Sequence, residues 1–410
     1  MSGAQLLRRA RPPIAAGARA IALGAMAGVL ATALLVAGCA TNKASAPAPL
    51  LKMRNRIAVR AVWHTRLRRE APKLRLGLGL AVAGQRVFAA SHGGELEAFD
   101  LMTGRRLWRR KLRVPLSGGP GVGAGLVVVG SSKGDVIALS QSDGRVRWRQ
   151  HVNSEILSAP AVGNDFVVVR GVDGRLEALT TAKGTDTWLA NQSVPQLSLR
   201  GTSRPVLVGD LAICGFDNGH VLAVDRTDGT IAWDAAVGQP HGTSELQRLI
   251  DVDAPVVLSG VDLYAVAYQG RVARLVLDSG RILWTHDLSS YRGLTVDGNS
   301  LYVSDANGDL VRLNAQNGTV IWQDKQLVNR ELSAPVVYHG AIVVGDLAGY
   351  LHWFDPATGR YLARVRVGKQ RIGATPAVAD GLLLVFDDGG QLAAYRTAGA
   401  AASANASANR

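Results

Sequence analysis

The feature that most restricts the fold of this chain is an internal repeat of about forty residues. Each unit has a glycine in a short polar turn and, in seven units, a second glycine ten residues later. The turn glycines are Gly94, Gly134, Gly174, Gly219, Gly270, Gly308, Gly349 and Gly390. Four residues after the second glycine stand Trp108, Trp148, Trp188, Trp233, Trp284 and Trp322, whereas the seventh unit has Ala363 there. Such a period indicates a repeat architecture.

Each unit has the pattern of β-strands joined by tight turns. The run 166–169 is rich in valine, Asp173-Gly174 is typical of a hairpin turn, and 176–179 alternates between apolar and other residues. Four strands in forty-odd residues make one propeller blade. The sequence therefore predicts an all-β, eight-bladed β-propeller of four-stranded antiparallel blades over residues 61–396. The tryptophans are expected to pack one blade against the next.

The two ends of the repeat region complement each other. The eighth unit ends at Tyr395 without a tryptophan strand, and residues 61–64 form such a strand, around Trp63, without the three that should precede it. We expect the Trp63 strand to complete the eighth blade and so remove an open sheet edge.

The N-terminal segment has the pattern of an export signal. Basic residues precede an apolar run over 21–36, and Leu35-Val36-Ala37-Gly38-Cys39 has the form of a lipobox. We expect a signal peptide over 1–38 and lipidation of Cys39; an uncleaved membrane anchor is the alternative. Ala40 then favours an outer-membrane lipoprotein that faces the periplasm of a Gram-negative cell. Residues 39–60 are expected to be a flexible tether and 397–410 a disordered tail.

The net charge of +14 does not indicate nucleic-acid binding, because it is concentrated near the N-terminus. Residues 39–75 hold ten Lys or Arg against the single Glu70, while residues 76–410 are almost neutral. The basic segment could contact anionic head groups or remain solvated.

No catalytic, metal or cofactor site is expected. Gly130–Gly134 matches the G-x-S-x-G pattern but falls in a strand-to-strand turn, whereas a nucleophile elbow leads into a helix. Residues 305–309 resemble a calcium loop with a misplaced glycine, and the eight histidines have no zinc-like spacing. Once Cys39 is lipidated only Cys214 remains, and its apolar surroundings predict a buried thiol.

Two adjacent connections between blades are longer than the others. They lie between Trp188 and Val206 and between Trp233 and Val256, and contain the segments 194–200 and 245–253. Both join an outer strand to the next inner strand, so both belong to one face of the disc, and insertions on one face commonly mark an interaction surface. The residues alone leave two alternatives open: the leucines could begin a buried strand, and Arg200 could pair with Asp251.

The Gly-x-x-x-Trp repeat resembles the tryptophan-docking repeat of pyrroloquinoline-quinone (PQQ) dehydrogenase propellers. The lipobox followed by eight such blades resembles the BamB family of the outer-membrane β-barrel assembly (BAM) complex. That resemblance implies a non-catalytic scaffold that binds the periplasmic POTRA domains of BamA, alongside other BAM subunits, and assists insertion of β-barrel proteins; unfolded outer-membrane proteins are candidate clients. It implies the contact residues Leu197, Leu199, Arg200, Asp251 and Asp253. A PQQ-dependent dehydrogenase and a carbohydrate-binding or peptidoglycan-binding propeller remain alternatives.

Overall fold

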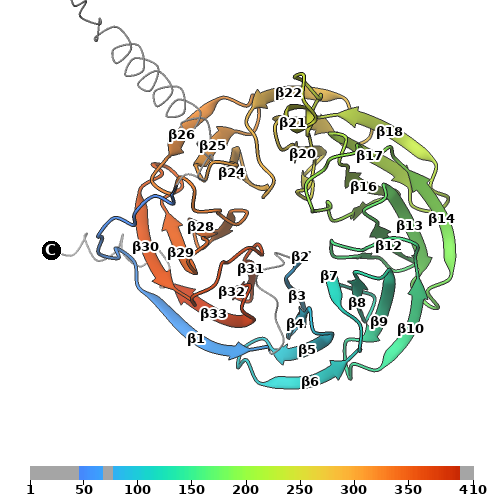
Figure 1. The fold of residues 1–410 in the computed structure, drawn as a ribbon. Coiled ribbons are helices and arrows are strands. Elements are labelled where there is room, and N and C mark those ends of the chain that lie inside the picture. The colour runs from blue at the N-terminus through green and yellow to red at the C-terminus, as the bar shows by residue number, and fades with distance from the viewer. Residues whose placement is uncertain (1–45, 68–76, 398–410) are drawn as a thin grey trace, which may run out of the picture. The chain divides into compact units, whose positions relative to one another are not determined.

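The computed structural model describes residues 46–67 and 77–397, which include an eight-bladed β-propeller (Figure 1). The predicted fold class is confirmed. Every blade contains four antiparallel strands, which in blades 1 to 7 follow chain order from the axis of the ring outward. In blade 8 the outermost strand comes from the N-terminal end of the chain.

The strand bounds are as follows. Blade 1 consists of β3 (Leu80–Ala83), β4 (Arg86–Ser91), β5 (Glu95–Asp100) and β6 (Arg106–Lys111), and blade 2 of β7 (Leu116–Gly123), β8 (Leu126–Ser131), β9 (Asp135–Ser140) and β10 (Val146–His151). Blade 3 consists of β11 (Ala161–Val162), β12 (Phe166–Arg170), β13 (Arg175–Thr180) and β14 (Asp186–Asn191), and blade 4 of β15 (Val206–Val208), β16 (Leu211–Gly215), β17 (His220–Asp225) and β18 (Ile231–Ala236). Blade 5 consists of β19 (Val257–Ser259), β20 (Asp262–Val266), β21 (Arg271–Val276) and β22 (Ile282–Asp287), and blade 6 of β23 (Leu294–Asp297), β24 (Ser300–Ser304), β25 (Leu310–Asn314) and β26 (Val320–Asp324). Blade 7 consists of β27 (Val336–Tyr338), β28 (Ala341–Gly345), β29 (Tyr350–Phe354) and β30 (Tyr361–Arg366), and blade 8 of β31 (Ala377–Ala379), β32 (Leu382–Phe386), β33 (Gln391–Thr397) and β1 (Val59–Arg66).

The middle strands hold the core because neighbouring blades cover both of their faces. All six residues of β8 are buried, whereas the outer strand β6 buries only Trp108. This explains why the middle strands have continuous apolar runs and the outer strands alternate.

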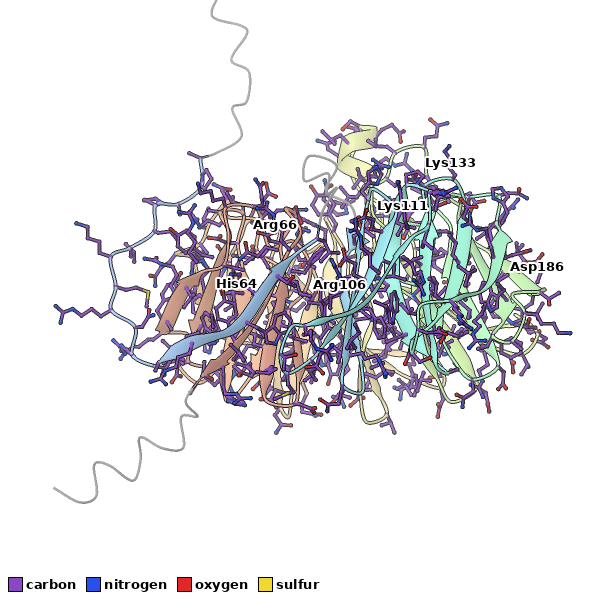
Figure 2. The ribbon with its side chains drawn as sticks, turned by 90° about the horizontal axis from the view of Figure 1, so that it is seen from below. His64, Arg66, Arg106, Lys111, Lys133 and Asp186 are labelled. Carbon is purple, nitrogen blue, oxygen red and sulfur yellow. The ribbon has the colours of Figure 1, made fainter. Side chains whose placement is uncertain are left out.

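The ring closes through β1, as predicted. β1 pairs antiparallel with β33, in a register that runs from Val59 opposite Thr397 to Arg66 opposite Gln391. Figure 2 shows β1 along the outer rim, with His64 and Arg66 on its length. The N-terminal strand and the last three strands of the propeller therefore share one sheet, and β33 is left without an open edge.

Tryptophans join the blades at seven junctions. Each indole lies against the second glycine of the next unit: Trp63 on Gly104, Trp108 on Gly144, Trp148 on Gly184, Trp188 on Gly229, Trp233 on Gly280, Trp284 on Gly318 and Trp322 on Gly359. A Cβ at Gly229 would lie 2.8 Å from the Trp188 ring, and the φ of this glycine is +77°. Glycine is required at this position because a side chain would collide with the indole and because L-residues with a side chain rarely adopt this positive φ. Each indole N–H also donates to a backbone carbonyl of the next blade, as from Trp188 to Arg226 O at 2.7 Å.

The junction between blades 7 and 8 is built differently. Ala363 occupies the tryptophan position, and the fully buried Trp353 of β29 stands directly opposite it. Trp353 belongs to a cluster with Val385 and Tyr395 of blade 8. The indole of Trp353, on the neighbouring strand, thus fills the space that a tryptophan at position 363 would occupy.

Part of the segment expected to be a flexible tether is bound to the propeller instead. In the N-terminal strap, residues 47–58, Ala48 N–H donates to Val328 O at 2.9 Å and Arg56 N–H to Leu362 O at 2.7 Å. Ile57 packs against the core between blades 7 and 8. The blades thus offer the strap partners that its composition does not reveal.

A second departure is a fifth strand on the blade 2 sheet. β2 (Gly77–Leu78) pairs in parallel with β7 at Gly118 and Gly119. The expected signal peptide, Cys39 and the tail over 398–410 lie outside the described residues. Within the described ranges, no helix is long and apolar enough to cross a membrane.

Candidate functional site

The two long connections lead into blades 4 and 5, as the spacing of the repeat predicts. The first, residues 192–205, ends at β15, and the second, residues 237–256, ends at β19. The second contains the short helix α2 (Glu245–Arg248), with Ser244 as its N-cap in a capping box. In Figure 2, α2 protrudes from one flat face of the ring, the face on which the turn with Lys133 also lies.

These connections expose apolar side chains to solvent. Leu197 is 40% exposed and Leu246, on α2, is 66% exposed, while Val194 is also exposed. Leucines at such exposure could anchor in a partner's groove. Leu197 lies well before β15, so it does not begin a buried inner strand. Leu246 was not among the predicted contact residues, although its place in a long insertion was a usable signal.

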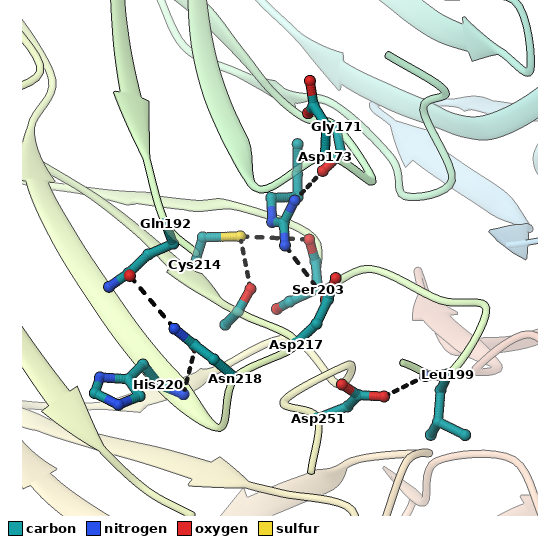
Figure 3. Close-up of polar contacts among 12 residues, drawn as sticks. Gly171, Asp173, Gln192, Leu199, Ser203, Cys214, Asp217, Asn218, His220 and Asp251 are labelled. Atoms are coloured by element: carbon teal, nitrogen blue, oxygen red, sulfur yellow. Dashed lines mark hydrogen bonds and ion pairs between the residues drawn. The ribbon is translucent and has the colours of Figure 1, made fainter. Parts of the chain in front are cut away.

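The two connections are tied together by Asp251. Its carboxylate accepts a hydrogen bond from Leu199 N–H (Figure 3), and its backbone carbonyl accepts one from Tyr268 N–H at 2.7 Å. The Asp251 side chain is 0% exposed. Asp251 is therefore placed to hold the Leu199 segment in position. It could contact a partner directly only if the loops moved and exposed its carboxylate to solvent.

Arg200 forms an ion pair with Glu155 and not with Asp251, the partner that the sequence left open. Its guanidinium lies 2.9 Å from Glu155, in the connection between β10 and β11, so it does not pair with Asp251 in this structure. Asp253 is partly exposed and packs against Gly201, where a Cβ would lie 2.9 Å from Asp253 Oδ2. The structure thus brings the sequence-predicted residues Leu199, Asp251 and Asp253 together, with Arg200 beside them.

Beneath these loops lies a buried ion pair that the sequence analysis missed. Arg170 Nη2 lies 3.3 Å from Asp217 Oδ1, with side chains only 0% and 5% exposed. The Arg170 guanidinium also stacks over the Phe216 ring, 4.3 Å from its centre. A charged residue at the end of the buried run 166–169 was the available signal, since unpaired charges are rarely buried.

The charge of Arg170 acts on the carboxyl groups of Asp217, Asp251 and Asp253, and of these three Asp217 is the one that it contacts in an ion pair. Burial raises the pKa of Asp217, which Arg170 partly offsets. Burial raises the pKa of Asp251 to about 7, against the hydrogen bond from Leu199. Burial and the neighbouring Asp251 raise the pKa of Asp253 well above its ordinary value. Protonation of Asp251 near neutral pH therefore reduces the electrostatic repulsion among these three carboxyl groups.

We expect the protein to gain stability as the pH falls from about 8 to about 5, with Asp251 contributing. Its pKa is about 7 when folded and 3.8 ordinarily, so the folded state holds a proton that the unfolded chain lacks between these values. The contribution is complete below 3.8 and is lost as the pH rises through 7. Asp251→Asn retains an acceptor for Leu199 N–H and should flatten the pH dependence of the unfolding free energy by on the order of a few kcal/mol. Urea unfolding across this range measures it, and parallel profiles for both proteins would contradict it.

The patterns that resembled catalytic or metal sites are structural. Gly130–Gly134 spans the end of β8 and the β8–β9 turn, where Ser131 Oγ donates to Asp135 Oδ2 at 2.9 Å. Burial raises the pKa of the Cys214 thiol to about 12, so it is not a thiolate at neutral pH. Among the described residues, no group of three His, Cys, Asp or Glu side chains could hold a metal ion.

Fold and site together define an eight-bladed, tryptophan-docked propeller with one face extended by two loops. The family described as "Outer membrane protein assembly factor BamB" matches residues 59–117 and 92–324. A relative from Pseudomonas aeruginosa with the same description is 46% identical over 371 residues, which are 90% of this chain and 98% of that protein. This chain belongs to the BamB family.

Solved structures agree with this assignment. The crystal structure of BamB from Moraxella catarrhalis superimposes with a TM-score of 0.77 at 26% identity, covering 83% of this chain and 100% of that one. A quinohemoprotein alcohol dehydrogenase from Pseudomonas putida matches with a TM-score of 0.65 at 12% identity, over 83% of this chain and 76% of that one. The second likeness shows the fold alone.

Proposed function

We propose that this chain is a non-catalytic scaffold that assists assembly and insertion of β-barrel proteins into the outer membrane. The observation that carries the proposal is its membership of a family whose relatives are named outer membrane protein assembly factors, at 46% identity over nearly the whole chain. The exposed leucines on one face of a rigid ring are consistent with a binding role.

We further propose that the two loops bind the POTRA region of BamA. Leu197 and Leu246 would enter an apolar groove, and Arg200, whose guanidinium is more than half exposed, would contact an acidic group at the rim. Leu199, Asp251 and Asp253 would hold the loops in the binding conformation, since Asp251 is buried against the Leu199 backbone.

We expect Leu197→Ala to weaken binding to a purified BamA POTRA fragment by about 2 kcal/mol, because truncation of an anchoring side chain removes apolar contact. Val261→Ala is a matched control: Val261 is 74% exposed and lies in the β19–β20 turn, at the opposite end of the blade from the two loops. Calorimetric titration measures affinity, and thermal unfolding without the partner measures stability. Equal affinity for the Leu197 variant and the wild type would place the interface elsewhere.

We propose that Cys39 carries the lipid anchor and holds the protein at the outer membrane, facing the periplasm. The lipobox before Cys39 supports this. Metabolic labelling with a fatty-acid analogue should be lost in Cys39→Ala, while Cys214→Ala should label like the wild type because that thiol is buried. Equal labelling of Cys39→Ala would refute the anchor.

A further inference from the structure

A cavity of about 480 Å³ lies where inner strands and connections of six blades converge. Its wall includes Leu80 of β3, Ala377 of β31, Arg204 and residues 157–159, 200–202 and 291–292. A cavity of this size can enclose a small molecule. Its chemistry is independent of the exposed leucines discussed above.

The wall is strongly basic. Four arginines line the cavity, Arg200, Arg204, Arg292 and Arg371, and Asp253 is the one acidic residue among the lining residues. Burial and neighbouring carboxylates raise the pKa of Asp253 well above its ordinary range, which disfavours its charged form. Counted over the lining residues alone, the cavity has a formal excess of three positive charges, part of which is offset by Glu155 beside Arg200 and by Asp388 beside Arg371.

Arg204 is the cation with the least internal compensation. Its side chain is exposed in the cavity, and no hydrogen bond or ion pair joins it to the other described residues. The surrounding protein nevertheless desolvates the guanidinium and lowers its pKa. A charge placed in this way favours an anion more strongly than a charge in open water does.

Arg292 and Arg371 compete for one carboxylate. Glu331 Oε2 lies 3.9 Å from Arg292 and 3.6 Å from Arg371, which also contacts Asp388 at 2.7 Å. Arg292 Nε is buried and lacks a hydrogen-bond partner among the described residues. Burial and then the charge of Arg371 lower the pKa of Arg292. The Nε of Arg292 is therefore a donor available to a further anion.

We propose that this cavity binds a small polyanion that carries phosphate or carboxylate groups. Guanidinium groups recognise both oxyanions through paired N–H donors, and three or more of them around one cavity would bind a multiply charged ligand. Arg204 supplies the charge that the protein leaves uncompensated, and Arg292 and Arg371 supply the opposite part of the wall. Apolar neighbours such as Leu80 and Ala377 lower the local dielectric and strengthen the attraction.

The test uses the purified full chain at physiological ionic strength, so that surface ion pairing is screened. Calorimetric titrations with pyrophosphate and with citrate identify which oxyanion binds. Arg204→Ala should weaken binding about tenfold or more, because a hydrogen bond to a charged group is lost. Arg204→Lys keeps the charge without the paired donors, so its affinity for the anion should lie between those of the wild type and of Arg204→Ala.

The control is Arg147→Ala, which removes the same charge from the exposed outer strand β10. It should bind like the wild type. Binding of either anion that depends on Arg204 supports the proposal, and selectivity between the two anions assigns the ligand class. Absence of binding to both at millimolar concentration, or equal loss in the Arg204 and Arg147 variants, would overturn it. Arg204 is not among the residues assigned to the partner, so failure here leaves the proposed function standing.

Discussion

A chain that lacks residues 1–67 is expected to fail to form a closed, monomeric ring. The deletion removes β1, and with it the whole antiparallel ladder to β33 from Val59 to Arg66. It also removes the Trp63 ring from Gly104 and the hydrogen bond from Trp63 Nε1 to Leu101 O at 2.9 Å. Loss of a buried tryptophan alone costs about 3–5 kcal/mol, against a total domain stability of about 5–15 kcal/mol. The exposed edge of β33 would then pair with other chains.

Size-exclusion chromatography and urea unfolding measure this outcome. Trp63→Ala in the full chain isolates the contribution of the side chain and should lower the unfolding free energy by about 3–5 kcal/mol. Val62→Ala is its neighbour on the same strand, exposed to solvent, and should change the unfolding free energy by less than about 0.5 kcal/mol. A monomeric truncated chain with unchanged stability would show that β1 does not close the ring.

The ring could be predicted because its determinants are local and repeated. The second glycines need positive φ and space for an indole, and this requirement appears in the sequence at a fixed offset from each tryptophan. Trp353 could not be predicted, because it occupies a cross-strand position opposite Ala363 that no other unit uses for an indole. The strap over 47–58 could not be predicted either, since it is held by scattered backbone and side-chain contacts to residues far away in the sequence, such as Leu362 and Arg364.

The location of the candidate site could be predicted from the sequence, whereas the orientation of its side chains could not. Insertion length located the two loops, but it could not tell that Asp251 faces inward to Leu199 N–H while Leu197 faces solvent. The charges of Arg170 and Asp217 also act on Asp251, and these two residues come from blades 3 and 4 and meet only in the folded ring. Long-range charge pairing of this kind has no signature at a fixed sequence spacing.

A second buried ion pair leads to the other large expected effect. Asp346 is fully buried and accepts hydrogen bonds from Arg330 Nε at 2.8 Å and from His352 Nε2 at 3.0 Å. Burial by itself would raise the pKa of Asp346, but the hydrogen bond from His352 and the charge of Arg330 outweigh it, so the pKa lies below 3.8. The carboxylate therefore stabilises the fold fully above the unfolded pKa of 3.8 and less as the pH falls through its lower folded value.

We expect Asp346→Ala to lower the unfolding free energy at neutral pH by about 3–5 kcal/mol, because it leaves the Arg330 guanidinium buried without its carboxylate. Arg330 also donates to Ala48 O at 2.9 Å, so the variant should expose the strap to proteolysis. Asp210→Ala is the matched control: Asp210 pairs with Arg226 at 3.9 Å on the surface, and its loss should cost less than about 1 kcal/mol. Urea unfolding and limited proteolysis report the two effects separately. Comparable stability losses in the two variants would mean that burial does not govern the strength of these pairs. Lost stability with an intact strap would show that the strap is held by the backbone hydrogen bonds of Ala48 and Arg56 rather than through Arg330.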